Sequence, residues 1–413
     1  MDNQYNDVLE TLKKYNQEHL LGFYEELSNV QKEKLLTQIS NIDFELINNL
    51  YENKDNIEIV NNKLEPVDYE IKENLDEQIQ EELKKIGNKA INDGEYAICV
   101  MAGGQGTRLG HNGPKGTFVV NTNPPMSIFE IIINRLKIES EKYNKDIFIY
   151  FMTSEENNDS TVDFFEKNNY FGYNKNNIIF FKQGKLPMIG LDGKILLERK
   201  DLAKEAADGN GGIFEALHKK EIISHMKQNS IKYLEIRNID NILFNICDEI
   251  ALGMLVKNDA EILSKSAVKA YPEEKVGVFC RKNDKLGVIE YMEMPKELVD
   301  KRDENGQLYY GDLNIGSFIF NIRGLEKIGS EKLPYHTALK KATYINKNGE
   351  EEKSETPNAY KFEAFIFDAF AKMDNYKILR VKREDEFAPI KNAEGVDSPE
   401  TALKLYNNKY GNN

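Results

Sequence analysis

The sequence is poor in cysteine, in basic charge and in long apolar segments, and each shortage excludes a class of protein. Its three cysteines, Cys99, Cys247 and Cys280, are far apart and form no C-x-x-C pair, which indicates reduced, buried thiols instead of a disulfide framework or a zinc site. The net charge of −14 argues against nucleic acid or an anionic membrane as a partner, because both bind basic surfaces. The longest strongly apolar run, residues 147–152, is far too short to cross a membrane.

The N-terminus and the histidines add two further absences. The first ten residues, MDNQYNDVLE, are acidic and contain no apolar segment of the kind found in secretory signal peptides, so we expect a cytoplasmic protein. The five histidines show no cluster typical of a metal site. A chain of 413 residues, 40% of them apolar, is nevertheless long enough for about two or three compact units with sizeable cores.

Hydrophobic periodicity predicts a change of structure near residue 90. Residues 1–89 carry apolar residues at steps of three and four and almost no glycine, which predicts an N-terminal helical region. Over residues 90–390, strand candidates alternate with helix candidates, which is typical of an α/β domain with a mixed, mostly parallel central sheet covered by helices. The strand candidates are residues 96–101, 147–152, 178–181 and 232–236. The helix candidates are residues 127–140, 161–168 and 213–228.

Strands dominate after residue 259, and we expect them to extend the sheet in antiparallel orientation. The candidates are residues 260–271, 276–282, 286–294 and 313–320. The end of the domain is predicted to form a helix over residues 359–370, a strand over 376–381 and a loop over 382–393. Residues 391–413 are left as a short C-terminal segment.

Four glycines, Gly103, Gly104, Gly106 and Gly110, directly follow the first predicted strand. Two common phosphate-binding patterns do not fit them. The Walker pattern needs Ser or Thr after Gly-Lys, but Leu and Ile follow the Gly-Lys pairs of this chain. In the dinucleotide pattern G-x-G-x-x-G, the last glycine would have to come one residue earlier. The pattern G-G-x-G-T-R-x-G followed by P-K, typical of nucleotidyltransferases, fits completely over residues 103–115.

Physical chemistry explains why such a loop would bind a nucleotide. Glycines let backbone N–H groups approach a base and a triphosphate with no Cβ in the way. Arg108 and Lys115 can neutralise charge that moves to the departing phosphates, and Pro114 stiffens the loop so that Lys115 keeps its direction. An ordinary glycine-rich turn is the weaker interpretation, because all these elements occur together directly after a strand.

Several further stretches carry a resemblance to a known family. VMAGGQGTRLG, YFGYNKNNIIFFKQGKLP, LDGKILLE, ADGNGGIFEAL, IDNIL, FEAFIFDAF and REDEFAPIKNA follow one another in this order. With them, the sequence resembles the UDP-sugar pyrophosphorylases over residues 17–405, and among these the eukaryotic-type UDP-N-acetylglucosamine pyrophosphorylases. The resemblance implies a Rossmann-like nucleotidyltransferase fold of the GT-A type. It also predicts that the C-terminal domain of the eukaryotic enzymes is missing from this chain.

The reaction that the resemblance implies converts UTP and N-acetylglucosamine 1-phosphate into UDP-N-acetylglucosamine and pyrophosphate. The sugar phosphate would attack the α-phosphorus of UTP in line, without a protein nucleophile, and Mg²⁺ would be held mostly by phosphate oxygens. Two alternatives stay open: the same chemistry on glucose or galactose 1-phosphate, and a non-catalytic nucleotide-sugar sensor. The expected partners are therefore small molecules, and the expected state is a monomer or a weak homo-oligomer.

The functional residues of the family carry over to matching positions of this chain. The resemblance assigns catalytic roles to Arg108, Lys115 and Lys391, and a metal contact to Asp240. It assigns nucleotide binding to Ala102, Gly103, Gly104, Gly106, Thr107, Gln183 and Gly209. It assigns sugar binding to Asn210, Gly277, Glu290, Asn314, Phe365 and Phe367. Structural alternatives stay open: Gly209 and Asp240 suit ordinary turns, Lys391 suits a solvated surface, and Phe365 and Phe367 suit the core face of a helix.

Overall fold

The computed structural model describes residues 2–54, 63–329 and 332–411, and the chain divides into two compact units. Unit 1 consists of residues 1–61, 184–212 and 333–366, and unit 2 consists of residues 62–183, 213–332 and 367–413. This division differs from the predicted boundaries at residues 89/90 and 390/391, because two later segments of the chain share a core with the N-terminal helices. Residues 55–62 of the predicted helical region lie outside the described residues.

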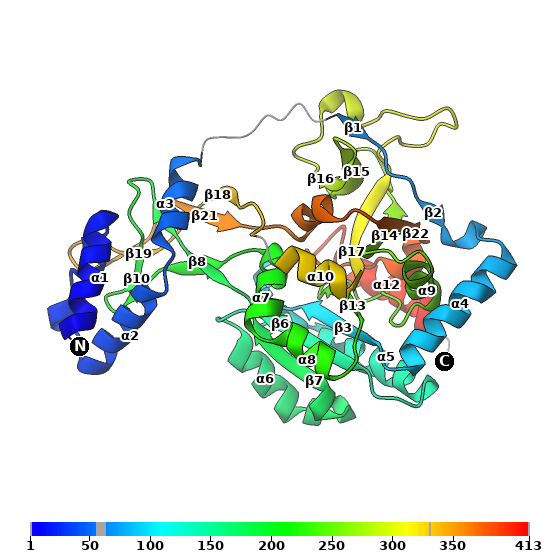
Figure 1. Ribbon diagram of the computed structural model, residues 1–413, viewed down its shortest axis with the longest axis horizontal. Coiled ribbons are helices and arrows are strands. Elements are labelled where there is room, and N and C mark those ends of the chain that lie inside the picture. The colour runs from blue at the N-terminus through cyan, green and yellow to red at the C-terminus, as the bar shows by residue number, and fades with distance from the viewer. Residues whose placement is uncertain (1, 55–62, 330–331, 412–413) are drawn as a thin grey trace. The chain divides into compact units, whose positions relative to one another are not determined.

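Unit 2 is built around a mixed, mostly parallel sheet, which confirms the predicted fold class (Figure 1). In spatial order, its main strands are β2 (Glu70–Ile71), β22 (Tyr376–Arg380), β14 (Ile262–Val268), β17 (Asp312–Asn321), β13 (Tyr233–Asn238), β3 (Tyr96–Met101), β6 (Phe148–Thr153) and β7 (Ile178–Lys182). Neighbours along this path are parallel, except that β17 is antiparallel to both β14 and β13. The sheet continues through β15 (Val278–Lys282), β16 (Lys285–Ile289) and β1 (Leu64–Glu65).

The parallel strands β13, β3, β6 and β7 end at one edge of the sheet. Strand β3, YAICVM, is buried at all six positions, as expected for a central parallel strand that is covered on both faces. Residues that follow these strands, among them Ala102, Gln183 and Asp240, therefore lie at the edge where α/β proteins bind ligands.

Helices α4 (Glu77–Asn92), α5 (Ile128–Lys142), α6 (Asn158–Lys167) and α9 (Glu249–Lys257) contribute to the core of unit 2. Helix α5 begins as predicted, because the Ser127 hydroxyl accepts a hydrogen bond from the backbone N–H of Glu130 at 3.1 Å. Helices α4 and α9 lie side by side (Figure 1). They approach so closely that a Cβ added to Gly253 would lie 1.9 Å from the Leu83 carbonyl oxygen.

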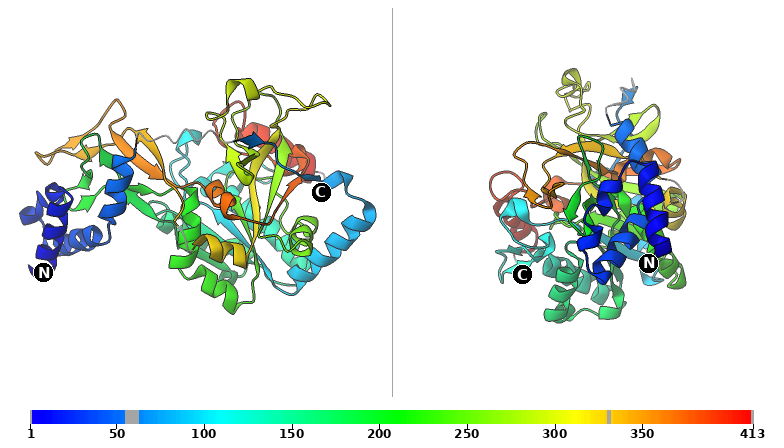
Figure 2. Two further views of the ribbon diagram at one scale, coloured as in Figure 1. Left: turned by 45° about the horizontal axis from the view of Figure 1, so that its top comes forward. Right: turned by 90° about the vertical axis from the view of Figure 1, so that its left-hand side faces the viewer.

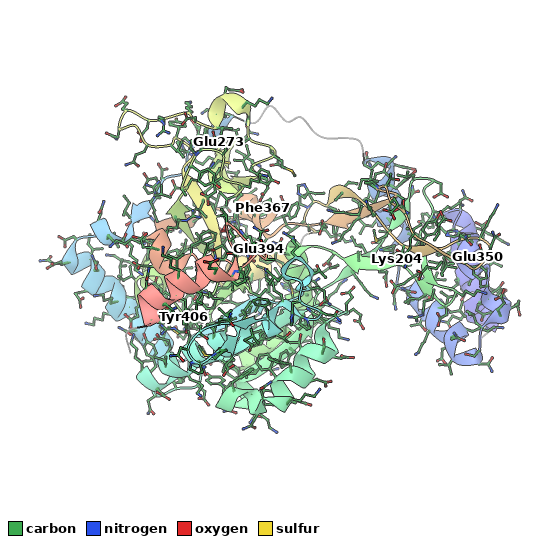
Figure 3. All side chains as sticks on the ribbon, turned by 180° about the vertical axis from the view of Figure 1, so that it is seen from behind. Lys204, Glu273, Glu350, Phe367, Glu394 and Tyr406 are labelled. Atoms are coloured by element: carbon green, nitrogen blue, oxygen red, sulfur yellow. The ribbon has the colours of Figure 1, made fainter. Side chains whose placement is uncertain are left out.

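The secondary-structure predictions for unit 2 need correction at three places. Residues 213–228 form two helices, α7 (Ile213–Lys219) and α8 (Ile222–Gln228), because Glu221 between them has a φ of 58°. The predicted loop over residues 382–393 begins with the short helix α11 (Arg383–Glu386). The terminal helix α12 (Pro399–Tyr410), drawn in red in Figure 2 and carrying the labelled Tyr406 in Figure 3, was not predicted. A capping box at Ser398, followed by proline at the first helical position, was the sequence signal for it.

Unit 1 combines α-helices with small sheets around a separate core. The helices are α1 (Asp2–Lys14), α2 (Asn29–Ser40) and α3 (Phe44–Glu52), as the helical periodicity predicts. One sheet has the order β11 (Leu202–Ala203), β10 (Leu197–Arg199), β19 (Tyr344–Ile345), β20 (Glu351–Glu352). The others are β18 (His336–Lys340), β21 (Ala359–Glu363), β9 (Ile189–Gly190), and the pair β12 (Glu205–Ala207), β8 (Lys185–Pro187).

The predicted helix over residues 359–370 is wrong. Its first part is strand β21, which pairs antiparallel with both β18 and β9, and its second part is the 3₁₀ helix η10 (Ile366–Lys372). The helical spacing of apolar residues was present, but two partner strands supply backbone hydrogen bonds that only the folded chain brings together.

The structure also describes the three cysteines and the length of the helices. Cys99, Cys247 and Cys280 are buried and free, as predicted. Within residues 2–54, 63–329 and 332–411, no helix is long and apolar enough to span a membrane. Further short elements of unit 2 are β4 (Val119–Val120), β5 (Met126–Ser127) and α10 (Ile322–Gly329).

Candidate active site

The glycine loop after β3 is closed by its own backbone hydrogen bonds. The N–H of Gly106 donates to the Gly113 carbonyl at 2.9 Å, and the N–H of Lys115 donates to the Gly104 carbonyl at 3.1 Å. A one-turn 3₁₀ helix, η4 (Thr107–Leu109), ends at Gly110, whose φ of 68° favours glycine. The loop is therefore a bonded hairpin of defined shape, and Thr107 and Arg108 stand exposed on it.

A buried asparagine that the sequence analysis missed holds the start of this loop. Asn157 is fully buried, and its Nδ2 donates to the carbonyls of Ala102 at 2.9 Å and Gly104 at 3.3 Å. Its Oδ1 accepts the N–H of Ser154 at 2.8 Å. Because both carbonyls accept hydrogen bonds from Asn157, this amide fixes the backbone at the start of the loop. No motif in the sequence marks this role, since the two loop carbonyls lie more than fifty positions away.

Gln183 lies directly beside Gly103, as its assignment to the nucleotide site requires. A Cβ added to Gly103 would lie 2.9 Å from Gln183 Oε1 and 3.1 Å from its Nε2. Gly104, in contrast, has no atom within 4 Å of an added Cβ. Gly103 is therefore required by the neighbouring glutamine, whereas Gly104 borders open space that a ligand can fill.

We predict that Gly103→Ala raises the KM for UTP, the substrate that the resemblance implies, by about tenfold, or about 1.4 kcal/mol. Thermal stability should change little. The added methyl meets only the flexible end of Gln183, so the amide moves aside and loses its position for a base edge. Steady-state kinetics and thermal unfolding of the variant test this. A large loss of stability with unchanged UTP affinity would contradict it.

Gly106 is constrained by the loop itself. An added Cβ would lie 2.8 Å from both Cβ and Cδ2 of His111, whose Nε2 lies 2.7 Å from the Thr117 hydroxyl. The sequence interpretation placed the reason for this glycine in close approach to the nucleotide. The structure adds a reason within the protein, so a substitution at Gly106 would also distort the hairpin.

Lys115 and Asp240 form the centre of the candidate site. The Lys115 Nζ lies 4.0 Å from Asp240 Oδ2, and both side chains are mostly buried. Burial lowers the pKa of Lys115, Asp240 opposes this by raising it, and Arg108 and Lys391 lower it further. The three predicted cations therefore act on one another electrostatically, and the ammonium of Lys115 is poorly compensated. An anion placed between these cations would be strongly stabilised.

Lys391 and Glu290 also interact electrostatically. Burial raises the pKa of the Glu290 carboxyl, Glu293 raises it further, and Lys391 opposes the shift. The ammonium of Lys391 itself lies 3.5 Å from Asp397 Oδ2. Lys391 is thus partnered and does not behave as a freely solvated surface lysine, which disfavours that structural alternative.

Gly277, Glu290 and Asn314 are brought together from three strands of unit 2. Glu290 directly follows β16, and a Cβ added to Gly277 would lie 2.8 Å from its Oε1. The N–H of Asn314, on β17, donates to the Gly277 carbonyl at 2.9 Å. The Oδ1 of Asn314 accepts the N–H of Gly316 at 2.9 Å, which leaves its Nδ2 as the group for a ligand oxygen.

Gly209, Asn210 and Phe365 belong to unit 1. Gly209 has a φ of 91°, and an added Cβ would lie 2.3 Å from the Ala364 carbonyl oxygen. Asn210 Oδ1 accepts the N–H of Ile366 at 3.0 Å. The turn interpretation therefore describes part of the role of these two residues, because both secure the backbone of residues 364–366.

The two phenylalanines are only half buried, in contrast to core residues of this protein. Phe365 precedes η10 and lies against His336, with ring centroids 4.7 Å apart. Phe367 lies in η10 and belongs to unit 2, where Figure 3 labels it. The alternative that both occupy the core face of one helix is wrong, because that helix does not form and neither ring is fully buried.

Comparison with known proteins identifies the family. A family model described as UTP–glucose-1-phosphate uridylyltransferase matches residues 42–409. The chain belongs to this family. It is 35% identical to the UDP-N-acetylglucosamine pyrophosphorylase of Saccharomyces cerevisiae over 413 aligned residues, which cover 96% of this chain and 85% of the yeast protein.

Further members of the uridylyltransferase family agree with this match. UDP-N-acetylglucosamine diphosphorylase 2 of Arabidopsis thaliana is 33% identical, with 96% of this chain and 82% of the plant protein covered. The crystal structure of the uridine diphosphate N-acetylglucosamine pyrophosphorylase of Trypanosoma brucei superposes with a TM-score of 0.84 at 29% identity, covering 98% of this chain and 84% of that chain. The resemblance read from the sequence motifs is therefore confirmed.

The residues available for a metal ion are few. Among the residues that the structure describes, no three His, Cys, Asp or Glu side chains are placed to hold a metal together. Asp240 offers a carboxylate at the strand-end edge, with Lys115 as its cationic neighbour. This donor set does not suit a metal held by protein alone, but it fits Mg²⁺, which is usually held by one or two carboxylates with substrate phosphates and water.

A cavity of about 600 Å³ in unit 2 lies apart from these residues. It opens at the ends of β14 and β22 and is lined by Val268, Tyr271 and Arg380 among others. None of the predicted site residues lines it. The site assignment depends on the glycine hairpin, the cations and Asp240, and not on this cavity.

We predict that Glu290→Gln stabilises the protein at neutral pH and weakens sugar-phosphate binding. Because burial raises the pKa of Glu290, the ionised form costs folding free energy above that pKa, and the cost disappears as the pH falls through it. The variant should unfold at a higher temperature at pH 7.5, and the difference should vanish near pH 4. The KM for the sugar phosphate should rise about tenfold through loss of a charged hydrogen-bond acceptor. Melting curves at both pH values and steady-state kinetics test this. A lower unfolding temperature at pH 7.5 or an unchanged KM would contradict the prediction.

Proposed function

We propose that the protein is a UTP-dependent uridylyltransferase that makes UDP-N-acetylglucosamine and pyrophosphate from UTP and N-acetylglucosamine 1-phosphate. The observation that carries the proposal is the glycine hairpin at the carboxyl end of β3, with Lys115 4.0 Å from Asp240 and within electrostatic reach of Arg108 and Lys391. The names of the relatives that span nearly the whole chain support the same reaction.

The mechanism derives from charge and position, because the transfer needs no covalent intermediate. Gln183 presents an amide that can both donate to and accept from a uracil edge. Exposed N–H groups of the hairpin receive the phosphates, and Arg108 and Lys115 neutralise the charge that builds up on the departing pyrophosphate. Lys391 balances the charge of the incoming sugar phosphate, whose oxygen displaces pyrophosphate at the α-phosphorus in line.

Asp240 would hold Mg²⁺ together with phosphate oxygens, and the ion would supply positive charge that neutralises the triphosphate. Lys115, whose ammonium lies 4.0 Å from the same carboxylate, would supply a second positive charge. The Glu290 carboxylate would accept hydrogen bonds from sugar hydroxyls. The Nδ2 of Asn314 would donate a hydrogen bond to a sugar hydroxyl or to the N-acetyl carbonyl.

The sugar is the part of the proposal that needs a direct test. The resemblance assigns Phe365 and Phe367 to the N-acetyl side of the sugar, which favours an N-acetylated sugar because an aromatic ring binds a methyl better than a hydroxyl. Glucose or galactose 1-phosphate is the alternative, since the family model carries the glucose-1-phosphate name. Pyrophosphate release should be measured with UTP, Mg²⁺ and a panel of sugar 1-phosphates. A preference for glucose 1-phosphate over the N-acetylated sugar would reverse the assignment.

A non-catalytic nucleotide-sugar sensor is the second candidate. It would bind UTP and the sugar phosphate with Mg²⁺ but release no pyrophosphate in the same assay. The complete set of Arg108, Lys115, Asp240 and Lys391 speaks for the enzyme. We also propose a cytoplasmic location, which three buried free cysteines support, and a monomer or weak homo-oligomer.

A further inference from the structure

Asn241, next to the candidate metal residue, is buried and hydrogen-bonded through both its amide nitrogen and its amide oxygen. Only 4% of it is exposed. Its Nδ2 donates to the carbonyl of Glu386 at 2.7 Å. Its Oδ1 accepts two N–H groups, that of Leu243 at 3.1 Å and that of Ala388 at 2.9 Å. One amide therefore ties the segment after β13 to the segment that leads to Lys391.

The backbone on both sides of this amide is paired as well. The N–H of Ile390 donates to the Asp240 carbonyl at 2.9 Å, and the N–H of Ile242 donates to the Ala388 carbonyl at 3.3 Å. Asn241 and Pro389 form an isolated antiparallel bridge between the same two segments. Asp240 lies one residue before this bridge and Lys391 two residues after it, so both functional side chains emerge next to it.

The far side of the Asn241 bond rests on a buried ionic group. Glu386, whose carbonyl receives the Asn241 amide, places its carboxylate 2.6 Å from the Nζ of Lys265, which is fully buried. Lys265 is also 2.6 Å from Asp248, the N-cap of α9. Because a paired charge in such surroundings cannot move without losing its partner, Glu386 is a fixed support.

We propose that Asn241 is a positioning residue that sets the placement of Asp240 relative to Lys391. This placement in turn sets the charge balance around the transferring phosphate. The inference rests on the proposed uridylyltransferase function. Two of the assigned residues come from distant parts of the chain, and the side chain of Asn241 adds two hydrogen bonds, to Glu386 and Ala388, to the backbone bonds that join their segments. An aliphatic side chain of similar size could fill the space but could make none of the three bonds.

The test compares Asn241→Ala with Asn321→Ala. Asn321 is a matched control, because it is 6% exposed and likewise bonds backbone on both sides: its Nδ2 donates to the Ala260 carbonyl at 2.8 Å and its Oδ1 accepts the Gly324 N–H at 2.7 Å. It pairs with Tyr233 at the start of β13, so it lies at the opposite edge of the sheet. Both variants should lose similar stability. Only Asn241→Ala should lower kcat, by about 10- to 100-fold, since small misplacements of reacting groups have effects of this size.

A double substitution separates positioning from general loosening. In the background of Lys391→Ala, the kcat effect of Asn241→Ala should shrink to less than about threefold, because the group that it positions is gone. An equal effect with and without Lys391, or equal kcat losses in the Asn241 and Asn321 variants, would overturn the proposal. If Asn241→Ala does not fold, Asn241→Ser serves instead, since its hydroxyl can still accept the Leu243 N–H two residues on.

The same variants distinguish this inference from the proposed function. A parent protein that releases no pyrophosphate overturns the enzymatic proposal. The positioning role is then decided by calorimetric titration with pyrophosphate and Mg²⁺. Asn241→Ala should weaken that binding by at least about fivefold while Asn321→Ala leaves it unchanged, and equal affinities in the two variants would refute the role of Asn241.

Discussion

Lys115→Ala is expected to lower kcat by about 10²- to 10³-fold, the loss typical of removing one group that stabilises charge in the transition state. The ammonium lies 4.0 Å from Asp240 and is mostly buried, and its pKa is lowered by burial and by two further cations. A charge held in such surroundings is poorly screened by water, so it acts strongly on phosphate oxygens that gain charge as pyrophosphate departs. Because we propose that uracil is bound by Gln183 and not by Lys115, UTP affinity should fall by less than about tenfold.

Pre-steady-state or steady-state kinetics together with calorimetric UTP titration measure both quantities. Lys257→Ala is a suitable control, because its ammonium pairs with Glu82 at 2.6 Å on the surface and it lies at the end of α9. That variant should match the parent in kcat and in UTP affinity. An undiminished kcat in Lys115→Ala would remove this lysine from the mechanism.

Asp240→Asn is expected to lower kcat by a similar factor, about 10²- to 10³-fold, and to raise the Mg²⁺ concentration needed for half-maximal activity by at least about tenfold. Asparagine has the same shape, and the Asp240 carbonyl can still accept the Ile390 N–H, so the backbone should remain in place. The substitution removes the carboxylate that lies 4.0 Å from the ammonium of Lys115. The partner of the ammonium and the proposed metal contact are therefore lost together.

Activity measured over a range of free Mg²⁺ separates these effects. Asp259→Asn, an exposed aspartate that pairs with Arg323, should show the Mg²⁺ dependence of the parent. Chelation of divalent ions should abolish turnover of the parent, and added Mg²⁺ should restore it. A parental Mg²⁺ requirement in Asp240→Asn would assign the metal to another group.

Much of the candidate site could be predicted from the sequence, but the residues that hold it in place could not. The hairpin, with Arg108 and Lys115, could be predicted because its residues lie within one short stretch and each has a local reason to be there. Asn157 and Asn241 were missed, because an isolated asparagine carries no local signal. Their importance depends entirely on carbonyl and N–H groups that reach them from distant segments.

The same limit explains the errors in secondary structure. Residues 359–363 have a helical apolar spacing, yet they form β21 because β18 and β9 lie on either side of it. The parallel strands β3, β6, β7 and β13 were predicted correctly. In β3 and β6 the signal was an almost unbroken apolar run, which is typical of a parallel strand that is buried on both faces. Local patterns decide structure where burial is complete, and pairing between distant segments decides it elsewhere.

The sequence by itself determined the family, the parallel sheet, the hairpin pattern and the residue types that the chemistry needs, because these properties depend on neighbouring residues. The tertiary structure alone decided that Gln183 lies against Gly103, that Glu290 lies against Gly277, and that Asp240 faces Lys115. It also decided that residues 184–212 and 333–366 join the N-terminal helices in one unit. The physical reason is that burial, charge compensation and hydrogen bonding between distant segments exist only after the chain has folded.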